Sequence, residues 1–180
     1  MKRIIHVIIT ILLCMPMIKA QSYYSTSKVI TKPDYTYQVD VRNDGSATLY
    51  NQSNKYTYKR YENKDGSELD ENILLGRVKL IENDNWTRQK CLSIVNNTFT
   101  QQEKEMLKND KLGIRMIVDT DSGKVIEVNY WFLYNKGFGN VELSVFRAIE
   151  EDLKKNIWFT LTEEGKKLNH VLVAWMHKVE

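Results

Sequence analysis

The sequence predicts an α+β protein. A β-rich N-terminal meander is expected over residues 35–82, and an α+β portion over residues 83–180, in which short helices precede an antiparallel β-β-α-β unit. Two observations predict this class. Apolar residues alternate along short segments separated by turns rich in Asn, Asp and Gly, which is typical of half-buried antiparallel strands. Within residues 83–157 apolar residues also recur at helical spacing. The two portions form either separate units or one domain.

Residues 1–20 have the three parts of a secretory signal peptide: a basic start, an apolar run, and the small residue Ala20 before Gln21. The run is too short for a membrane span, and no later segment reaches about 18 uninterrupted apolar residues. We therefore expect an exported protein, periplasmic or extracellular, without a transmembrane segment in the mature chain. Cys14 follows Leu13 instead of a small residue, which argues against a lipoprotein anchor.

Charge and cysteine content exclude two further classes. The chain has 26 Lys and Arg against 23 Asp and Glu, and three of the basic residues lie in the signal peptide, so the mature chain is close to neutral. A nucleic-acid-binding protein needs a surplus of basic side chains, and the mature chain has none overall, which leaves only a local basic patch as an alternative. Cys91 is the only thiol after the signal peptide, which excludes an internal disulfide. It lies beside Leu92 on an apolar stretch and has no local His, so we expect it to be buried and unreactive.

The N-terminal portion is expected to be a series of strands. Residues 21–34 have no sustained period and form a tail or a lone edge strand. Apolar and polar residues alternate from Tyr35 to Arg42, and Asn43-Asp44-Gly45 then supplies a turn. Further strands are expected at 46–51, 55–61 and 77–81, with a loop at 67–75.

Most of the ten tyrosines lie between Tyr23 and Tyr61. Tyr56 and Tyr58 share one face of a predicted strand, and they would be the centre of an aromatic surface that stacks on a glycan or another small ligand. The alternative is that these rings pack in the sheet because Tyr is a favoured strand residue. Tyr56 and Tyr58 are thus the possible ligand-binding residues. No catalytic, cofactor-binding or metal-binding residue is predicted.

The C-terminal portion begins with two short helices, one from about Trp86 and one after a capping box formed by Thr100 and Glu103. Strands at 112–118 and 126–132 follow, joined by a hairpin turn that contains Gly123. The main helix starts between residues 140 and 144 and ends near 157.

Charged and histidine side chains in this portion have structural explanations. On the main helix Glu150 and Glu151 are each four residues before a Lys, so we interpret them as a solvated charged face. After a loop at 163–167 comes a last strand, over 171–176, that is apolar on both faces and is expected to be buried on both. His170 and His177 point to opposite faces of this strand and are not expected to share a metal.

Several segments resemble a family of small secreted Bacteroidetes proteins classed as a domain of unknown function. The resemblance implies a location and no activity. The region from Trp86 to Lys178 also resembles the C-terminal domain of the TonB family in pattern. Thr160 follows the aromatic pair where that family usually has Pro, and a Pro-rich linker is missing, so energy transduction is not implied. The segments that carry the first resemblance are Trp86-Thr87, residues 91–96, residues 120–125, residues 157–160 and residues 164–169.

The predicted function is that of a non-catalytic module that binds another envelope protein, because a small antiparallel sheet ends in edges that can accept a partner strand. The alternative is binding of a glycan or small ligand through the tyrosine-rich strands. A hydrolase is the least favoured class, since the mature chain has no nucleophile elbow and no helical zinc-binding histidine pair. The sequence predicts no cofactor, and it leaves the oligomeric state open.

Overall fold

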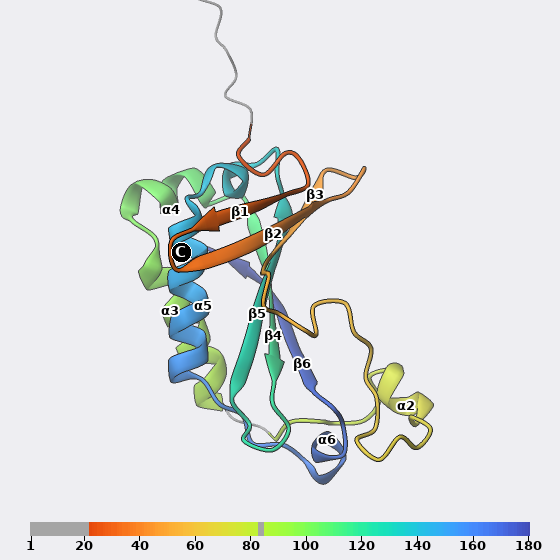
Figure 1. Cartoon of the computed structure of the whole chain (residues 1–180). Coiled ribbons are helices and arrows are strands. Elements are labelled where there is room, and N and C mark those ends of the chain that lie inside the picture. The colour runs from red at the N-terminus through yellow and green to blue at the C-terminus, as the bar shows by residue number, and fades with distance from the viewer. Residues whose placement is uncertain (1–21, 83–84) are drawn as a thin grey trace, which may run out of the picture.

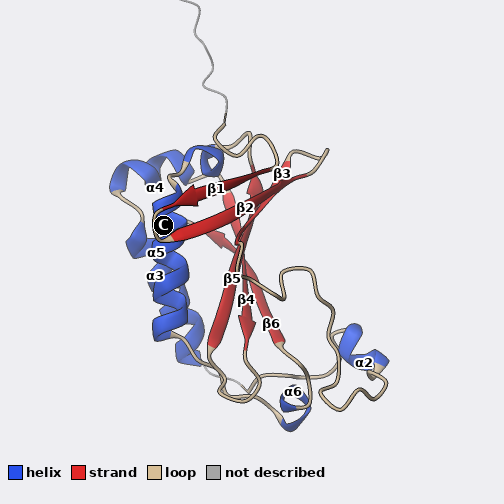
Figure 2. Ribbon diagram, viewed as in Figure 1, coloured by secondary structure: helices blue, strands red, loops and turns tan. Residues whose placement is uncertain are grey.

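The computed structural model describes residues 22–82 and 85–180, and it confirms the α+β class (Figure 1, Figure 2). The predicted signal peptide lies outside the described residues. The strands are β1 (Lys28–Lys32), β2 (Tyr35–Val41), β3 (Ser46–Asn51), β4 (Lys111–Val118), β5 (Val125–Leu133) and β6 (Val171–Lys178). The helices are α2 (Glu71–Leu74), α3 (Asn85–Thr98), α4 (Gln101–Leu107), α5 (Leu143–Asn156) and α6 (Glu163–Lys166), with a 3-10 helix η1 (Gly137–Asn140).

All six strands belong to one antiparallel sheet in the order β1-β2-β3-β5-β4-β6. β3 pairs with β5, so strands from the N-terminal and C-terminal portions share this sheet. The predicted order of two strands, a helix and a strand is confirmed by β4, β5, α5 and β6. The sheet has two edges, which are β1 and β6.

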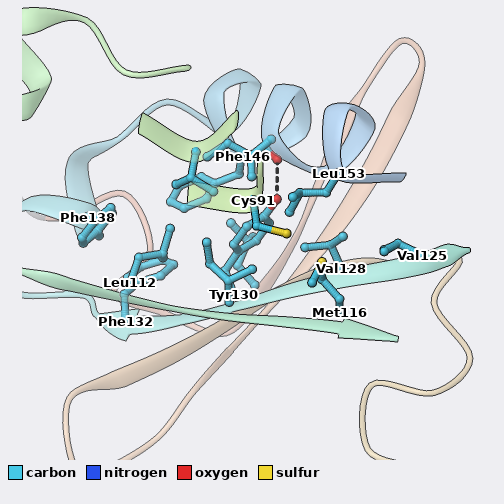
Figure 3. Close-up of a cluster of buried hydrophobic side chains, with 14 of the residues drawn as sticks. Cys91, Leu112, Met116, Val125, Val128, Tyr130, Phe132, Phe138, Phe146 and Leu153 are labelled. Atoms are coloured by element: carbon cyan, nitrogen blue, oxygen red, sulfur yellow. Dashed lines mark hydrogen bonds between the residues drawn. The ribbon is translucent and has the colours of Figure 1, made fainter. Parts of the chain in front are cut away.

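The longer helices, α3 and α5, cover one face of the sheet. α5 packs on β5 and α3 packs beside α5, whereas the long connection that carries α2 lies on the other side (Figure 1, Figure 2). The core fills the space between helices and sheet. Tyr130 and Phe132 of β5 face Phe146 and Leu153 of α5, and the thiol of Cys91 comes from α3 (Figure 3). The Tyr130 hydroxyl donates to the carbonyl of Phe146 at 2.7 Å, so its only polar group is satisfied.

Local sequence signals fix the ends of several elements. The capping box is confirmed, because the Thr100 hydroxyl accepts from the N–H of Glu103 while the Glu103 carboxylate accepts from the N–H of Thr100. Gly123 closes the β4–β5 hairpin with a φ of 71°, in the left-handed region that favours glycine. A Cβ at that position would also collide with the carbonyl oxygen of Phe159.

The strand predicted at 55–61 is wrong, because this segment is a loop. β3 already pairs with β2 on one side and β5 on the other, so neither of its edges is free for another strand. The Glu127 carboxylate on β5 instead accepts the N–H groups of Lys55 at 2.5 Å and Tyr56 at 3.0 Å. Residues 55–61 have strand propensity, but they form no strand because no strand edge beside them is free for pairing.

Two smaller differences concern the connections. The strand predicted at 77–81 is wrong, since a single bridge forms there, between Ile81 and Leu161. The loops predicted at 67–75 and 163–167 each contain a short helix, α2 and α6. Of the two alternatives for residues 21–34, the edge strand is confirmed, because β1 pairs with β2.

β6 is not buried on both faces as predicted. Its residues alternate between a helix-covered side, where Val171 and His177 are buried, and an outer side, where Ala174 and Met176 are exposed. The outer side of β6 is therefore apolar although no helix covers it.

Candidate functional site

β6 is the last strand of the sheet, and no strand of the described chain pairs with its outer side. The N–H of Leu172 donates to the Tyr61 hydroxyl at 3.3 Å, so the backbone of Leu172 points away from β4. The direction of these groups alternates along an antiparallel strand. The backbone groups of Ala174 and Met176 therefore also point outward. This part of β6 is an open sheet edge.

A groove with a volume of about 450 Å³ crosses the sheet face that the helices leave uncovered. Trp131 on β5 and Met176 on β6 flank it, and 40% and 49% of their surfaces are exposed. Gly113 on β4 pairs with both residues, and a Cβ there would lie 3.3 Å from Cε3 of Trp131. The missing side chain lets the indole ring lie against β4. The other lining residues are Arg42, Thr48, Tyr58, Ile114, Arg115, Asn129, Ala174 and Trp175.

Asn129 supplies an unused hydrogen-bond donor to this groove. The residue is only 3% exposed, and its Nδ2 has no hydrogen-bond partner in the part of the chain that the structure describes. A buried polar group without a partner costs free energy, typically about 1 to 3 kcal/mol. An acceptor within hydrogen-bond distance of Nδ2 would remove that cost.

Two charged side chains line the groove, and both are arginines, Arg42 and Arg115. Neither Arg42 nor Arg115 forms an ion pair with any described residue, and both are exposed. Among residues 22–82 and 85–180, Arg115 donates a single long hydrogen bond, from Nη1 to the carbonyl of Thr57 at 3.5 Å. A guanidinium has five N–H donors in a fixed fork, so most of those of Arg115 are available to a carboxylate.

Tyr58 lines this groove, whereas Tyr56 does not. The Tyr58 hydroxyl donates to Asp40 at 2.6 Å, and its ring lies edge-on to Tyr50. Burial, followed by the hydrogen bond to Asp40, raises the pKa of Tyr58 to about 12, which keeps the hydroxyl protonated. The Tyr56 ring instead packs on His170 with centroids 4.7 Å apart. The two tyrosines that sequence reasoning placed on one face are therefore separated.

On the helix-covered side of β6 lies a second, smaller cavity of about 130 Å³. Cys91, Met116 and Phe159 contribute apolar wall, and Trp175 comes from β6 itself. The Trp175 indole N–H and the hydroxyl of Thr87 are buried here without a hydrogen-bond partner among the described residues. We call this cavity the slot. β6 is thus flanked by the groove on one face and the slot on the other.

The interpretation of Glu150 as part of a solvated face is wrong. Glu150 is fully buried and accepts from the hydroxyl of Tyr37 and from Nη1 of Arg147, the latter at 3.1 Å. Lys154 lies 3.5 Å from its other oxygen. Burial, followed by the charge of Glu150, raises the pKa of Tyr37 far above its usual range, so Tyr37 stays a donor. The cluster fixes α5 to β2, and we assign it a structural role.

Cys91 and the two histidines lie apart from each other in the described chain. Burial raises the pKa of Cys91 to about 12, so the thiol stays protonated, in agreement with the prediction of an unreactive thiol. His170 contacts the rings of Tyr56 and Tyr61, while His177 lies 3.0 Å from the side-chain oxygen of Asn96. Burial lowers the pKa of both histidines. The two histidines therefore contact different side chains.

Two further features bear on the class of protein. Over residues 22–82 and 85–180, no cluster of three or more His, Cys, Asp or Glu side chains is arranged to hold a metal ion. Within the same residues, every helix is too short or too polar to span a bilayer.

Comparison with known proteins identifies the family. The model of DUF5043, described as a domain of unknown function, matches residues 20–175. A crystal structure of a DUF5043 family protein from Bacteroides uniformis is 34% identical, with a TM-score of 0.80, and the match covers 89% of this chain and 95% of that one. No curated protein matches. As its resemblance to a Bacteroidetes domain of unknown function predicted, the chain belongs to the DUF5043 family.

Proposed function

We propose that this protein is a non-catalytic module that binds an extended segment of another protein by adding it as a strand beside β6. The observation that carries the proposal is the pair of outward-facing residues, Ala174 and Met176, on an edge strand without a partner. Backbone groups of a bound segment would complete the ladder, and this supplies affinity that does not depend on the partner's sequence.

The two cavities beside β6 support the same proposal. Side chains of an added strand alternate between the two faces of the sheet. Those on one face would lie next to Met176 and the groove, and those on the other next to Trp175 and the slot. Alternating pockets are how strand-adding modules select their ligands. Cys91, His170 and His177 are not among the residues that line the groove, which supports a binding role over a catalytic one.

The strand beside β6 could come from another copy of this chain or from a different protein. Charge favours a different protein. A second β6 contains no Asp or Glu, so it would leave Arg115 and Arg42 without a carboxylate. A partner segment with acidic residues would satisfy them. We place the binding outside the cytoplasm because of the predicted signal peptide; N-terminal sequencing of the purified protein should begin at Gln21.

Proline substitution at matched edge positions tests the proposal. Ala174→Pro removes an N–H that points outward from β6, so the β4–β6 ladder is kept. Val29→Pro is the control, because Val29 points outward from β1, the opposite edge, and is 50% exposed. We expect peptides selected from a displayed random library to bind Ala174→Pro at least about tenfold more weakly than wild type and to bind Val29→Pro unchanged.

A second measurement covers the case in which Ala174→Pro does not fold. N-methylation of successive backbone nitrogens of the selected peptide should weaken binding at every other position, because alternate N–H groups enter the ladder. A library that yields no binder, a peptide that binds Ala174→Pro as well as wild type, or an N-methylation profile without this alternation would overturn strand addition.

A second candidate is binding of a glycan or other small polar ligand within the groove. It is favoured by the free Nδ2 of Asn129 and by the exposed rings of Tyr58 and Trp131. Rings of this kind stack on sugars. Here Tyr58→Ala should abolish binding on a glycan array, whereas Tyr56→Ala should leave it unchanged, because Tyr56 does not line the groove. The opposite pattern would reject this candidate.

A further inference from the structure

We infer that the segment bound beside β6 carries an acidic side chain, preferentially Glu, at the position that pairs with Ala174, and that Arg115 binds its carboxylate. This inference rests on the proposed strand addition. It specifies the class of partner: an extended segment with an acidic residue on the groove side.

The register of the sheet places the three positions in one row. Ala174 pairs with Arg115, and Arg115 pairs with Asn129. A residue of an added strand opposite Ala174 would continue this row outward and would point to the same face. The methyl group of Ala174 is all that stands between that residue and Arg115. A larger side chain at position 174 would separate them.

The distance suits a long acidic side chain. Neighbouring strands lie about 4.8 Å apart, so the added residue would be about 10 Å from Arg115, Cα to Cα. An extended arginine covers more than half of that distance, and a glutamate covers most of the rest. Aspartate is shorter by one methylene and would reach the guanidinium less well.

The guanidinium of Arg115 already lies toward this edge. Its Nη1 donates to Thr57, in the loop that leads to Tyr61, and the Tyr61 hydroxyl caps Leu172 on β6. Burial raises the pKa of Tyr61, and the Leu172 hydrogen bond and the charge of Arg115 both oppose the rise, which agrees with a nearby guanidinium. No carboxylate among the described residues pairs with it.

The opposite face constrains the neighbouring positions. Residues of the segment that flank the acidic one would point to the side of Val173 and Trp175, where the slot has mainly apolar walls. Glu82 and Arg88 also line the slot, at its polar side. The expected segment therefore places apolar residues on either side of its glutamate.

A double-mutant cycle on the full chain tests the pair. The probes are a peptide selected from the displayed library and its Glu→Gln analogue. On wild type we expect the analogue to bind roughly tenfold more weakly, because a charge-assisted hydrogen bond is lost. On Arg115→Gln the two peptides should bind almost equally. Arg77→Gln is the control: it removes an exposed arginine that lines neither the groove nor the slot, and it should keep the preference.

Thermal unfolding of each variant provides the folding check, and Arg115 is exposed, so Arg115→Gln should unfold as wild type does. If selected peptides lack an acidic residue, or if the Glu→Gln cost is the same on Arg115→Gln as on wild type, the inference is wrong. A different result would show that strand addition itself is wrong. In that case the selected peptides would bind Ala174→Pro as well as they bind wild type, with or without a preference for Glu.

Discussion

The two edges of the sheet, β1 and β6, differ in how readily another strand could pair with them. β1 is five residues long, has Lys28 and Lys32 at its ends, and is followed by Pro33. A short strand, terminal lysines and a proline are features by which proteins prevent pairing at an edge. β6 is eight residues long, and its open part carries Ala174 and Met176. One edge is closed by its sequence, and the other is left open.

The attachments of the two edges to the helices differ as well. β2, the neighbour of β1, is fixed to α5 by Tyr37 and the buried carboxylate of Glu150. β6 is fixed at its end by neutral groups: His177 contacts Asn96 of α3, and Asn96 also accepts from the N–H of Glu180. The closed edge thus depends on a buried charge, whereas the open edge depends on a neutral histidine. This difference makes the two edges separable by experiment.

The largest expected effect is a loss of stability at the closed edge, β1 and β2, when Glu150 is replaced. Glu150→Ala leaves the buried Tyr37 hydroxyl without its acceptor, and we expect a loss of roughly 2 to 3 kcal/mol in the free energy of unfolding. Urea denaturation measures this loss. Hydrogen exchange should show that β1 and β2 lose protection before β6 does.

Glu151→Ala is the matched control for Glu150→Ala. Glu151 also pairs with Arg147, at 2.8 Å, but its side chain is 59% exposed. An exposed ion pair contributes little, so the control should cost less than about 1 kcal/mol. Equal costs for the two variants would mean that Glu150 does not fix the closed edge.

A smaller loss of stability is expected at the open edge, β6, when the pH falls and its histidines become protonated. Burial lowers the pKa of His170, with opposition from Glu62 and help from Lys59, and burial lowers the pKa of His177, with opposition from Glu180. The folded pKa values thus lie below the ordinary value of 6.5. The unfolded chain binds protons first, so stability is complete above that value and is lost as pH falls below it, toward the folded pKa values.

Hydrogen exchange at about pH 7 and about pH 5 checks this prediction, since most carboxylates stay ionised over that range. Protection should fall in β6 and its neighbour β4 but not in β1, which contains no histidine. In His177→Gln the pH dependence should shrink, because one of the two titrating groups is gone. A uniform loss of protection in both edges would contradict the assignment to the histidines.

Prediction from the sequence succeeded where a segment determines its own structure. The alternating residues of β4 and β5, the turn at Gly123 and the cap at Thr100 depend on neighbours in the chain, and the structure confirms them. The segment at 55–61 has similar strand propensity, but a strand also requires a free neighbour. That requirement depends on the order of strands in the sheet, which no local pattern contains.

The candidate site was predicted only in part for the same reason. Its open edge followed from the fold class, and Tyr58 was among the two candidate residues. Arg115 and Asn129 were missed, because they come together through the register of β4 and β5. The signal that pointed to them is that both are polar residues on the alternating outer face of strong strands, yet this pattern alone does not distinguish a groove from an ordinary solvated face. Glu150 was misread because its spacing to Lys154 fits an exposed pair equally well.

The smallest expected effect comes from opening the closed edge. In the double variant Lys28→Thr with Lys32→Thr, β1 keeps good strand formers but loses the charges that discourage pairing. We expect unfolding free energy to change by less than about 0.5 kcal/mol, apart from the loss of the Lys28 contact with the Tyr23 ring. Sedimentation at rising protein concentration should reveal weak self-association that wild type lacks at the same concentrations.

Lys55→Thr with Lys90→Thr is the matched control, because it removes the same charge from exposed positions outside both edges. If both double variants associate equally, net charge and not the edge is responsible. If neither associates, the shortness of β1 and Pro33 are sufficient to close it, and the lysines are ordinary surface residues. Association of the edge variant alone would mean that β1 is closed by its side chains, and that an edge of this sheet accepts a strand when such side chains are absent, as they are between Ala174 and Met176.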